Sequence, residues 1–137
     1  MSTYVQTNQM VYVPASTAPN TIYRVNAADS GKTLLIPSNG AVGNTLNINL
    51  PARAAGLKFK FMASDAVTAI TTIRATTDGT TTINALFYGC FWNIPNGAHP
   101  SVARKVGVDT VQFNAAANVG DFIEVNCDGT YWYTLGQ

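Results

Sequence analysis

Apolar and polar residues alternate along most of this chain, and this alternation limits the folds that it can adopt. In the stretch TLNINL, Leu46, Ile48 and Leu50 fall on one side of an extended backbone, and the two asparagines fall on the other. The stretch LKFKFM repeats the pattern, with Phe59 and Phe61 on the apolar side. Because the side chains of a β-strand point alternately to its two faces, a period of two predicts strands with one buried face.

The same pattern continues toward both ends of the chain. In TVQFNA, Val111 and Phe113 are predicted to face inward. Further strands are expected at residues 3–13, 21–25, 33–36, 70–76 and 81–88, and in a closing pair near the carboxyl end. No stretch shows the 3.6-residue period of a helix. About eight to ten short strands predict one all-β domain, a jelly-roll-like antiparallel β-sandwich, with a barrel as the alternative.

Glycine after Asn or Asp marks the turns that we expect between these strands. Such pairs accept the positive φ of a tight turn. They occur as Asn39 with Gly40, Asp78 with Gly79, Asn96 with Gly97 and Asp128 with Gly129. The six prolines fall at expected strand ends or in loops, where a missing N–H costs least.

Two segments interrupt the strand rhythm. Residues 1–20 are expected to form an extended amino-terminal arm ahead of a β-sandwich domain at residues 21–137. The arm can pack on its own domain or reach a neighbouring subunit. Residues 89–109 are expected to project as a long irregular loop that carries Trp92, His99, Arg104 and Lys105.

Charged residues are scarce, which restricts the partners of the chain. They make up 11% of the sequence, against about 25% in a typical domain, and the net charge is +1. Because 47% of the residues are hydrophobic, the chain is predicted to fold. The basic residues form no stripe, so we expect no nucleic-acid partner. A weakly charged surface resists self-association poorly, which fits a protein that lies against other copies or another protein.

The sequence also lacks the patterns of membrane and exported proteins. No run of about 18 apolar residues predicts a membrane span. The start MSTYVQTNQMVYV has no basic flank followed by an apolar core, so we expect no signal peptide.

No group of residues predicts catalysis, a cofactor or a metal site. His99 is the single histidine and is interpreted as an ordinary loop residue, with a Cys–His pair with Cys90 as a remote alternative. Cys90 and Cys127 match no metal spacing and are interpreted as reduced, buried thiols, with a disulfide as the alternative. Asp78 and Asp128 are interpreted as turn residues. We therefore expect that the protein is not an enzyme.

The carboxyl-terminal stretch GDFIEVNCDGTYWYTLGQ predicts a hairpin with two different faces. A two-residue turn at Asp128 and Gly129 would place Val125 opposite Trp132 on the core face. Tyr combines contact area with a polar tip and is enriched at interfaces. The candidate interface residues are therefore Tyr131, Tyr133, Phe122 and Leu135 of the other face, with Trp92 of the loop. Cover by another part of the same chain, or a sugar-stacking platform, are the alternatives.

Three segments resemble a group of viral structural proteins. They are ADSGKTLLIPSNGAVGNTLNINLP, ITTIRATTDGTTTINA and VGDFIEVNCDGTYWYTLGQ, and the resemblance covers roughly residues 28–135. This order of strands and turns resembles the small β domains of tail-fibre, head-fibre and capsid-decoration proteins of phages and large viruses. The strongest part is Gly120-Asp121 followed by the run CDGT and Trp132.

The resemblance implies a small jelly roll or related sandwich that trimerises and has no catalytic residues. We therefore expect a capsid cement or decoration subunit, made in the host cytoplasm and located on the capsid surface of the virion. Its expected partners are two further copies in a homotrimer and the major capsid protein or other virion proteins. The sequence shows no stalk or repeat, which favours this role over a tail- or head-fibre knob that binds a host glycan or receptor. A glycan depolymerase is the enzymatic alternative.

Overall fold

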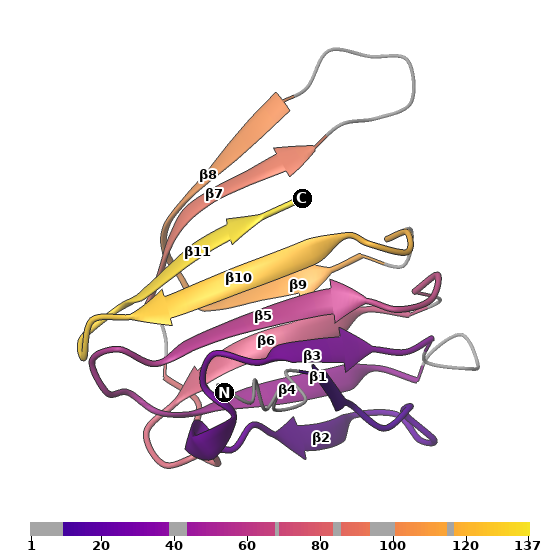
Figure 1. Ribbon diagram of the computed structural model, residues 1–137, viewed down its shortest axis with the longest axis horizontal. Helices are drawn as coiled ribbons and strands as arrows, with labels where there is room; N and C mark the ends of the chain where they lie inside the picture. Colours follow the sequence, from indigo (N-terminus) through magenta and orange to yellow (C-terminus); the bar gives the residue numbers. More distant parts are fainter. Residues whose placement is uncertain (1–9, 39–43, 68, 84–85, 94–100, 115–116) are drawn as a thin grey trace, which may run out of the picture.

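The computed structural model describes residues 10–38, 44–67, 69–83, 86–93, 101–114 and 117–137. In these residues the chain forms eleven strands, arranged as two facing sheets, and one short 3-10 helix (Figure 1). The prediction of an all-β domain is confirmed. The elements are β1 (Met10–Tyr12), β2 (Thr21–Arg24), the 3-10 helix η1 (Ala27–Asp29), β3 (Thr33–Ile36), β4 (Leu46–Ala52), β5 (Lys58–Ala63), β6 (Thr71–Thr76), β7 (Phe87–Asn93), β8 (Ser101–Val108), β9 (Thr110–Phe113), β10 (Phe122–Cys127) and β11 (Trp132–Gly136).

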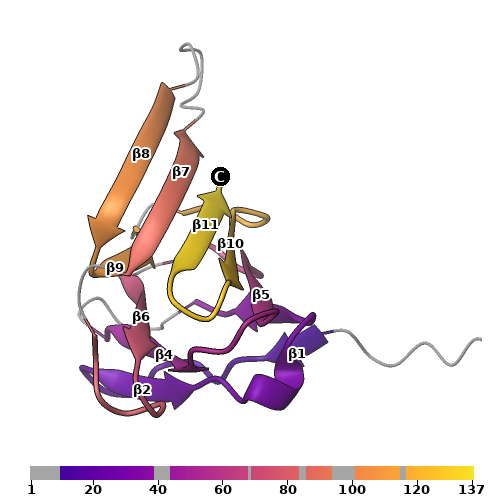
Figure 2. The ribbon, with the colours of Figure 1, turned by 90° about the vertical axis from the view of Figure 1, so that its left-hand side faces the viewer.

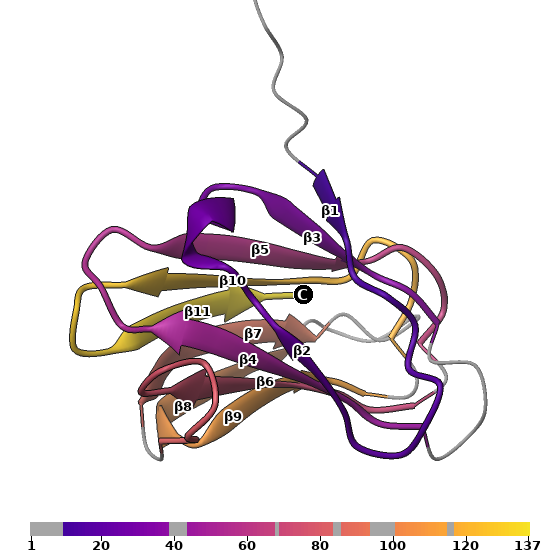
Figure 3. The ribbon, with the colours of Figure 1, turned by 90° about the horizontal axis from the view of Figure 1, so that it is seen from below.

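The two sheets differ in size. The larger sheet has seven strands in the order β1-β3-β5-β10-β11-β7-β8, and the smaller has four in the order β2-β4-β6-β9. Figure 3 shows β3, β5 and β10 on one side of the domain and β4, β6 and β9 on the other. The larger sheet extends beyond the smaller one, because the β7–β8 hairpin rises away from the remaining strands (Figure 2).

From β1 to β6 the chain winds around the core. Odd-numbered strands join the larger sheet and even-numbered strands join the smaller one. Thr21 pairs with Leu46 and Leu46 pairs with Thr71, an offset of 25 residues in each case. One complete coil of the chain around the core therefore takes 25 residues in this sheet.

The direction of strand pairing differs from the prediction of an antiparallel sandwich. Among the nine strand pairs of the described residues, five are parallel and four are antiparallel. The coil explains four of the parallel pairs, because a strand that returns to the same sheet after a full coil runs in its original direction. The prediction was wrong for these pairs because side chains alternate in the same way in parallel and in antiparallel strands.

The core lies between the sheets and follows the predicted alternation. The three inward residues of TLNINL are fully buried, and Phe59 and Phe61 are at most 2% exposed. Val111 and Phe113 of β9 are also buried, and Trp132 is the largest fully buried side chain. Each such side chain contributes about 1.5–3 kcal/mol by leaving water.

Asn49 is the exception to this pattern, since it was predicted to face outward and is buried. Its amide donates to the carbonyl of Gly79 at 3.1 Å, and its oxygen accepts from Arg74 Nε at 3.1 Å. The turn that contains Gly79 is held by Asp78, whose carboxylate accepts the hydroxyl of Thr80 at 2.6 Å. This hydrogen bond and those from nearby amides lower the pKa of Asp78 to about 2. Asp78 is thus a turn residue, as predicted.

Two predictions for residues 81–109 were wrong. In the expected strand at residues 81–88, the described residues before β7 form only an isolated bridge, between Thr82 and Thr76, and β7 begins at Phe87. The expected irregular loop instead contains the antiparallel pair β7 and β8. We did not predict β7 because the apolar residues of its segment FYGCFWN follow one another without alternation. Residues 94–100, with His99 and the predicted turn at Asn96 and Gly97, lie outside the described residues.

The described part of the predicted amino-terminal arm packs on its own domain. β1 pairs with β3, and the Val13 amide donates to the Leu35 carbonyl at 3.0 Å. Val13 and Ser16 are buried. Residues 1–9 and the predicted turn at Asn39 and Gly40 lie outside the described residues.

Candidate interaction surface

β10 and β11 form the predicted closing hairpin, in a register two residues away from the predicted one. Val125 pairs with Thr134, and Cys127 pairs with Trp132. A two-residue turn would have placed Val125 opposite Trp132. Because the shift is even, every side chain keeps its predicted face. Ile123 therefore points into the core with Val125, Cys127 and Trp132.

The carboxylate of Asp128 accounts for the longer turn. Its Oδ1 accepts from the amides of Thr130 and Tyr131 at 2.7 and 2.8 Å, and its Oδ2 accepts from the Tyr133 hydroxyl at 3.0 Å. The amides, that of Tyr131 first, lower the pKa of Asp128 below its usual value. The hydrogen bond to Asp128 raises the pKa of the Tyr133 hydroxyl. Asp128 is therefore a turn residue, as predicted, and also fixes one tyrosine on the outer face.

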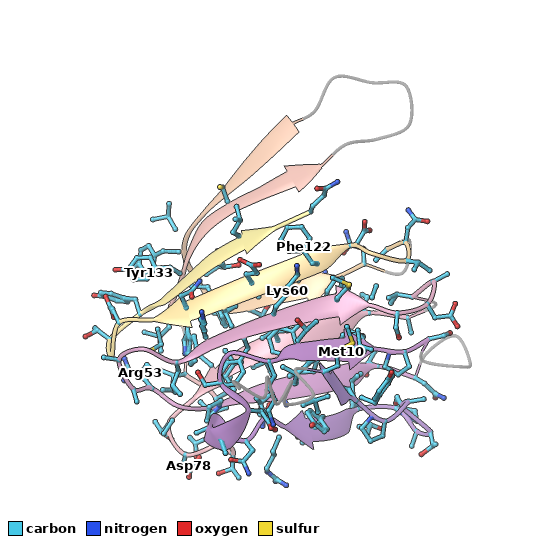
Figure 4. All side chains as sticks on the ribbon, in the orientation of Figure 1. Met10, Arg53, Lys60, Asp78, Phe122 and Tyr133 are labelled. Atoms are coloured by element: carbon cyan, nitrogen blue, oxygen red, sulfur yellow. The ribbon has the colours of Figure 1, made fainter. Side chains whose placement is uncertain are left out.

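Four of the five candidate interface residues lie together at the surface. Tyr131 is 37% exposed, Tyr133 47% and Leu135 42%, while Phe122 is half-buried. Tyr133 and Phe122 project from neighbouring strands of the larger sheet (Figure 4). Tyr88 of β7 adds a further ring, which meets that of Tyr131 edge-on with centroids 5.0 Å apart. Tyr88 was missed because the pairing of β7 with β11 could not be predicted.

Trp92, the fifth candidate, lies on β7, two strands away from β10. Its side chain is outside the described part of the structure. Its place at a shared surface therefore stays a prediction.

The same surface extends across the larger sheet, and we call the outward side of β1, β3, β5, β10, β11 and β7 the outer face. Strand register places an apolar row across four of these strands. The row is Tyr12, Leu35, Met62 and Phe122. Tyr12 is 73% exposed, and Met10 beside it is 50% exposed. The sequence pattern pointed to the hairpin alone, because the neighbours of β10 were not predictable.

Charged groups occupy the centre of the outer face. Lys60 Nζ lies 3.9 Å from the Glu124 carboxylate and 4.8 Å from the centre of the Phe122 ring. Both members of the ion pair are more than one-third exposed, so the pair contributes about 0.2–1 kcal/mol at most. Beside it, a shallow depression of about 260 Å³ lies between β3, β5 and β10.

The two cysteines are unbonded and differ in exposure. Cys127 is buried, as predicted, and its sulfur accepts the Gly129 amide at 3.3 Å. Cys90 is partly exposed and pairs with Leu135 in the sheet, so the prediction of a buried thiol was wrong for this residue.

Nothing in the described residues indicates a metal centre, since no group of three or more His, Cys, Asp and Glu side chains is placed to hold an ion. Nor does any helix in this part of the chain have the length and apolar character needed to cross a membrane. Comparison of the chain with protein-family models, curated proteins and solved structures found no match. The outer face is therefore the basis on which a function can be proposed.

Proposed function

We propose that the chain is a structural protein of a virion, a cement or decoration subunit that forms homotrimers and stabilises the capsid shell. The observation that carries the proposal is the exposure of Tyr131, Tyr133 and Leu135 on the outer face. The outward side of a sheet in a two-layer domain is normally polar. An outward side with exposed tyrosines and apolar residues instead suits burial against another protein.

The dimensions of the outer face fit this role. Its six strands, about 4.8 Å apart, give a face roughly 24 Å wide. A stable interface buries about 800 Å² on each partner, and a large aromatic side chain supplies about 150–250 Å² when fully buried. The exposed parts of Tyr12, Tyr131 and Tyr133, with Met10 and Leu135, can supply much of that area.

The remaining features of the proposed role follow from its repetition on a capsid. Many copies on one shell gain from multivalency, so each contact with the major capsid protein can be weak. The role requires no catalysis, cofactor or nucleic acid. The jelly-roll assignment belongs to this proposal. The two-layer arrangement of the sheets fits it, whereas the parallel pairs of β1 to β6 depart from the antiparallel form of that fold.

The native mass of the purified chain at micromolar concentration tests the trimer. Three chains of 14.6 kDa would give about 44 kDa. The variants Tyr131→Ser and Leu135→Ser should shift the trimer toward monomer. Ile22→Ser is the matched control, because Ile22 is 49% exposed on β2 of the opposite sheet. A monomeric parent chain, or equal effects of all three variants, would refute the proposed interface.

One observation favours the second candidate function, a fibre knob that binds a host glycan. Tyr88, which is half-buried, and the exposed Tyr131 form an aromatic pair, and Asp128 near them accepts a hydrogen bond from the Tyr133 hydroxyl. Sugar rings stack on such side chains and donate hydrogen bonds to carboxylates. A glycan array on which the parent chain binds and Tyr131→Ala does not would favour the knob. An array without any bound glycan would count against it.

A further inference from the structure

We infer that the depression between β3, β5 and β10 is a binding site for a carboxylate, presented by an acidic and apolar peptide segment of a partner protein. The site is argued from its own residues and does not depend on the trimer. It goes beyond the proposed function because it specifies the chemistry of the partner.

The depression brings together most of the lysines of the chain. The chain contains four lysines, and three of them line this one depression of about 260 Å³. Lys32 directly precedes β3, and Lys58 and Lys60 come from β5. The hydroxyl of Thr33 and the amide of Asn126 add two groups that can donate hydrogen bonds.

The acidic groups around the depression leave one ammonium group unpaired. Lys32 Nζ lies 2.8 Å from Asp29, and Lys60 Nζ lies 3.9 Å from Glu124. Lys58 is exposed and has no acidic partner among the described residues. Three ammonium groups therefore face two carboxylates, and the local charge is +1. One further carboxylate would neutralise the depression.

The surroundings of the depression favour a peptide as the source of this carboxylate. On one side lies the apolar row with Leu35, Met62 and Phe122, next to Lys60 and Glu124 in the register of β5 and β10. Successive outward residues of a strand are about 6.6 Å apart. An acidic side chain in the depression would thus have its apolar neighbours within reach of Met62 and Phe122. An acidic sugar, which carries hydroxyl groups around its ring, would leave this row without a partner.

A two-dimensional NMR titration of the full chain tests the site. The probe is the acetylated and amidated peptide Ala-Leu-Glu-Leu-Ala, and the control peptide has Gln in place of Glu. We expect the Glu peptide to shift the amide signals of Thr33, Lys58, Lys60 and Asn126, with an affinity that falls as salt is added. We expect the Gln peptide to bind up to about fivefold more weakly, since about 1 kcal/mol is the upper range for one exposed charge pair.

Charge reversal provides the matched variants. Lys58→Glu should weaken binding of the Glu peptide by about tenfold or more, because the unpaired ammonium becomes a carboxylate. Arg24→Glu makes the same change of charge at an exposed position on β2 of the opposite sheet and should leave the affinity within about twofold. Comparison of each variant's spectrum with that of the parent chain shows whether the variant is folded.

Four results would overturn the inference. No shift at millimolar peptide would exclude the site, and equal binding of the Gln peptide would exclude recognition of the carboxylate. Equal losses in Lys58→Glu and Arg24→Glu would mean that only net charge matters. Tighter binding of N-acetylneuraminic acid at the same residues would assign the site to an acidic sugar. A monomeric chain would refute the trimer but leave this site standing, and failure of the peptide would leave the trimer standing.

Discussion

Replacement of Trp132 by Phe tests the packing of the core at its largest side chain. Trp132 is fully buried, with its ring centre 6.2 Å from that of Phe59, and its Nε1 has no hydrogen-bond partner among the described residues. An unpaired buried donor costs about 1–3 kcal/mol of stability. Trp132→Phe removes this N–H together with side-chain volume, so its two effects have opposite signs.

The magnitudes nearly cancel. Phe is smaller by roughly 40 Å³, and a cavity of that size costs about 1 kcal/mol at about 24 cal/mol per Å³. The lost burial of roughly 40 Å² adds about 1 kcal/mol at about 25 cal/mol per Å². Loss of the unpaired N–H offsets these terms, so we expect the free energy of unfolding to change by less than about 1 kcal/mol. Trp132→Ala has no such compensation and should cost about 3–5 kcal/mol.

Urea denaturation followed by far-ultraviolet circular dichroism measures these differences without relying on the tryptophan that is removed. Phe87→Leu is the control, because Phe87 is fully buried beside Trp132 and carries no polar atom. It should cost about 1–1.5 kcal/mol. A loss of 3 kcal/mol or more in Trp132→Phe would refute the reasoning, since it would mean that the indole N–H is paired in the folded protein.

Three further predictions concern β11, β7 and the turn after β6. The hydroxyl of Thr134 is buried without a hydrogen-bond partner among the described residues. Thr134→Val should therefore raise the free energy of unfolding by about 1 kcal/mol in the same assay. A lower free energy of unfolding would show that the hydroxyl is paired. Gly89 has φ +150°, and a Cβ there would overlap the Thr134 carbonyl. Gly89→Ala should therefore lower the melting temperature by about 10 °C or more, and an unchanged melting temperature would contradict this close approach. Because the pKa of Asp78 is lowered from 3.8 to about 2, its stabilising effect is complete above about pH 4 and is lost as the pH falls toward 2. Asp78→Asn should therefore lower the urea midpoint at pH 6 and match the parent near pH 2; a pH-independent difference would contradict the hydrogen-bonded carboxylate.

The alternation of side chains predicted the strands and their inward faces well. Leu46, Ile48 and Leu50 are buried as predicted, because burial depends only on which face of a strand is apolar. The direction of pairing was not predictable on the same grounds. Nothing in TLNINL distinguishes a strand that meets its neighbour through a hairpin from one that meets it after a full coil around the core.

The candidate surface was predicted in part. The hairpin faces were correct, since the true register differs from the predicted one by two residues and an even shift preserves them. The register itself was missed because the Asp128 carboxylate binds two amides and opens the turn, a preference that the pair Asp128 and Gly129 does not reveal. The lysine-lined depression was missed because it joins β3, β5 and β10, whose adjacency depends on the topology of the whole domain.

The winding of β1 to β6 limits how the length of this protein can change. Because Thr21, Leu46 and Thr71 are in register at 25-residue steps, an insertion of one full step before β7 would add one strand to each sheet and leave the later strands in place. An insertion of half a step would move every later strand to the opposite sheet and turn its apolar side chains away from the core. The amino-terminal half of the domain is therefore expected to grow or shrink in whole coils only, as solenoid proteins do, while the hairpins after β6 fix where the winding stops.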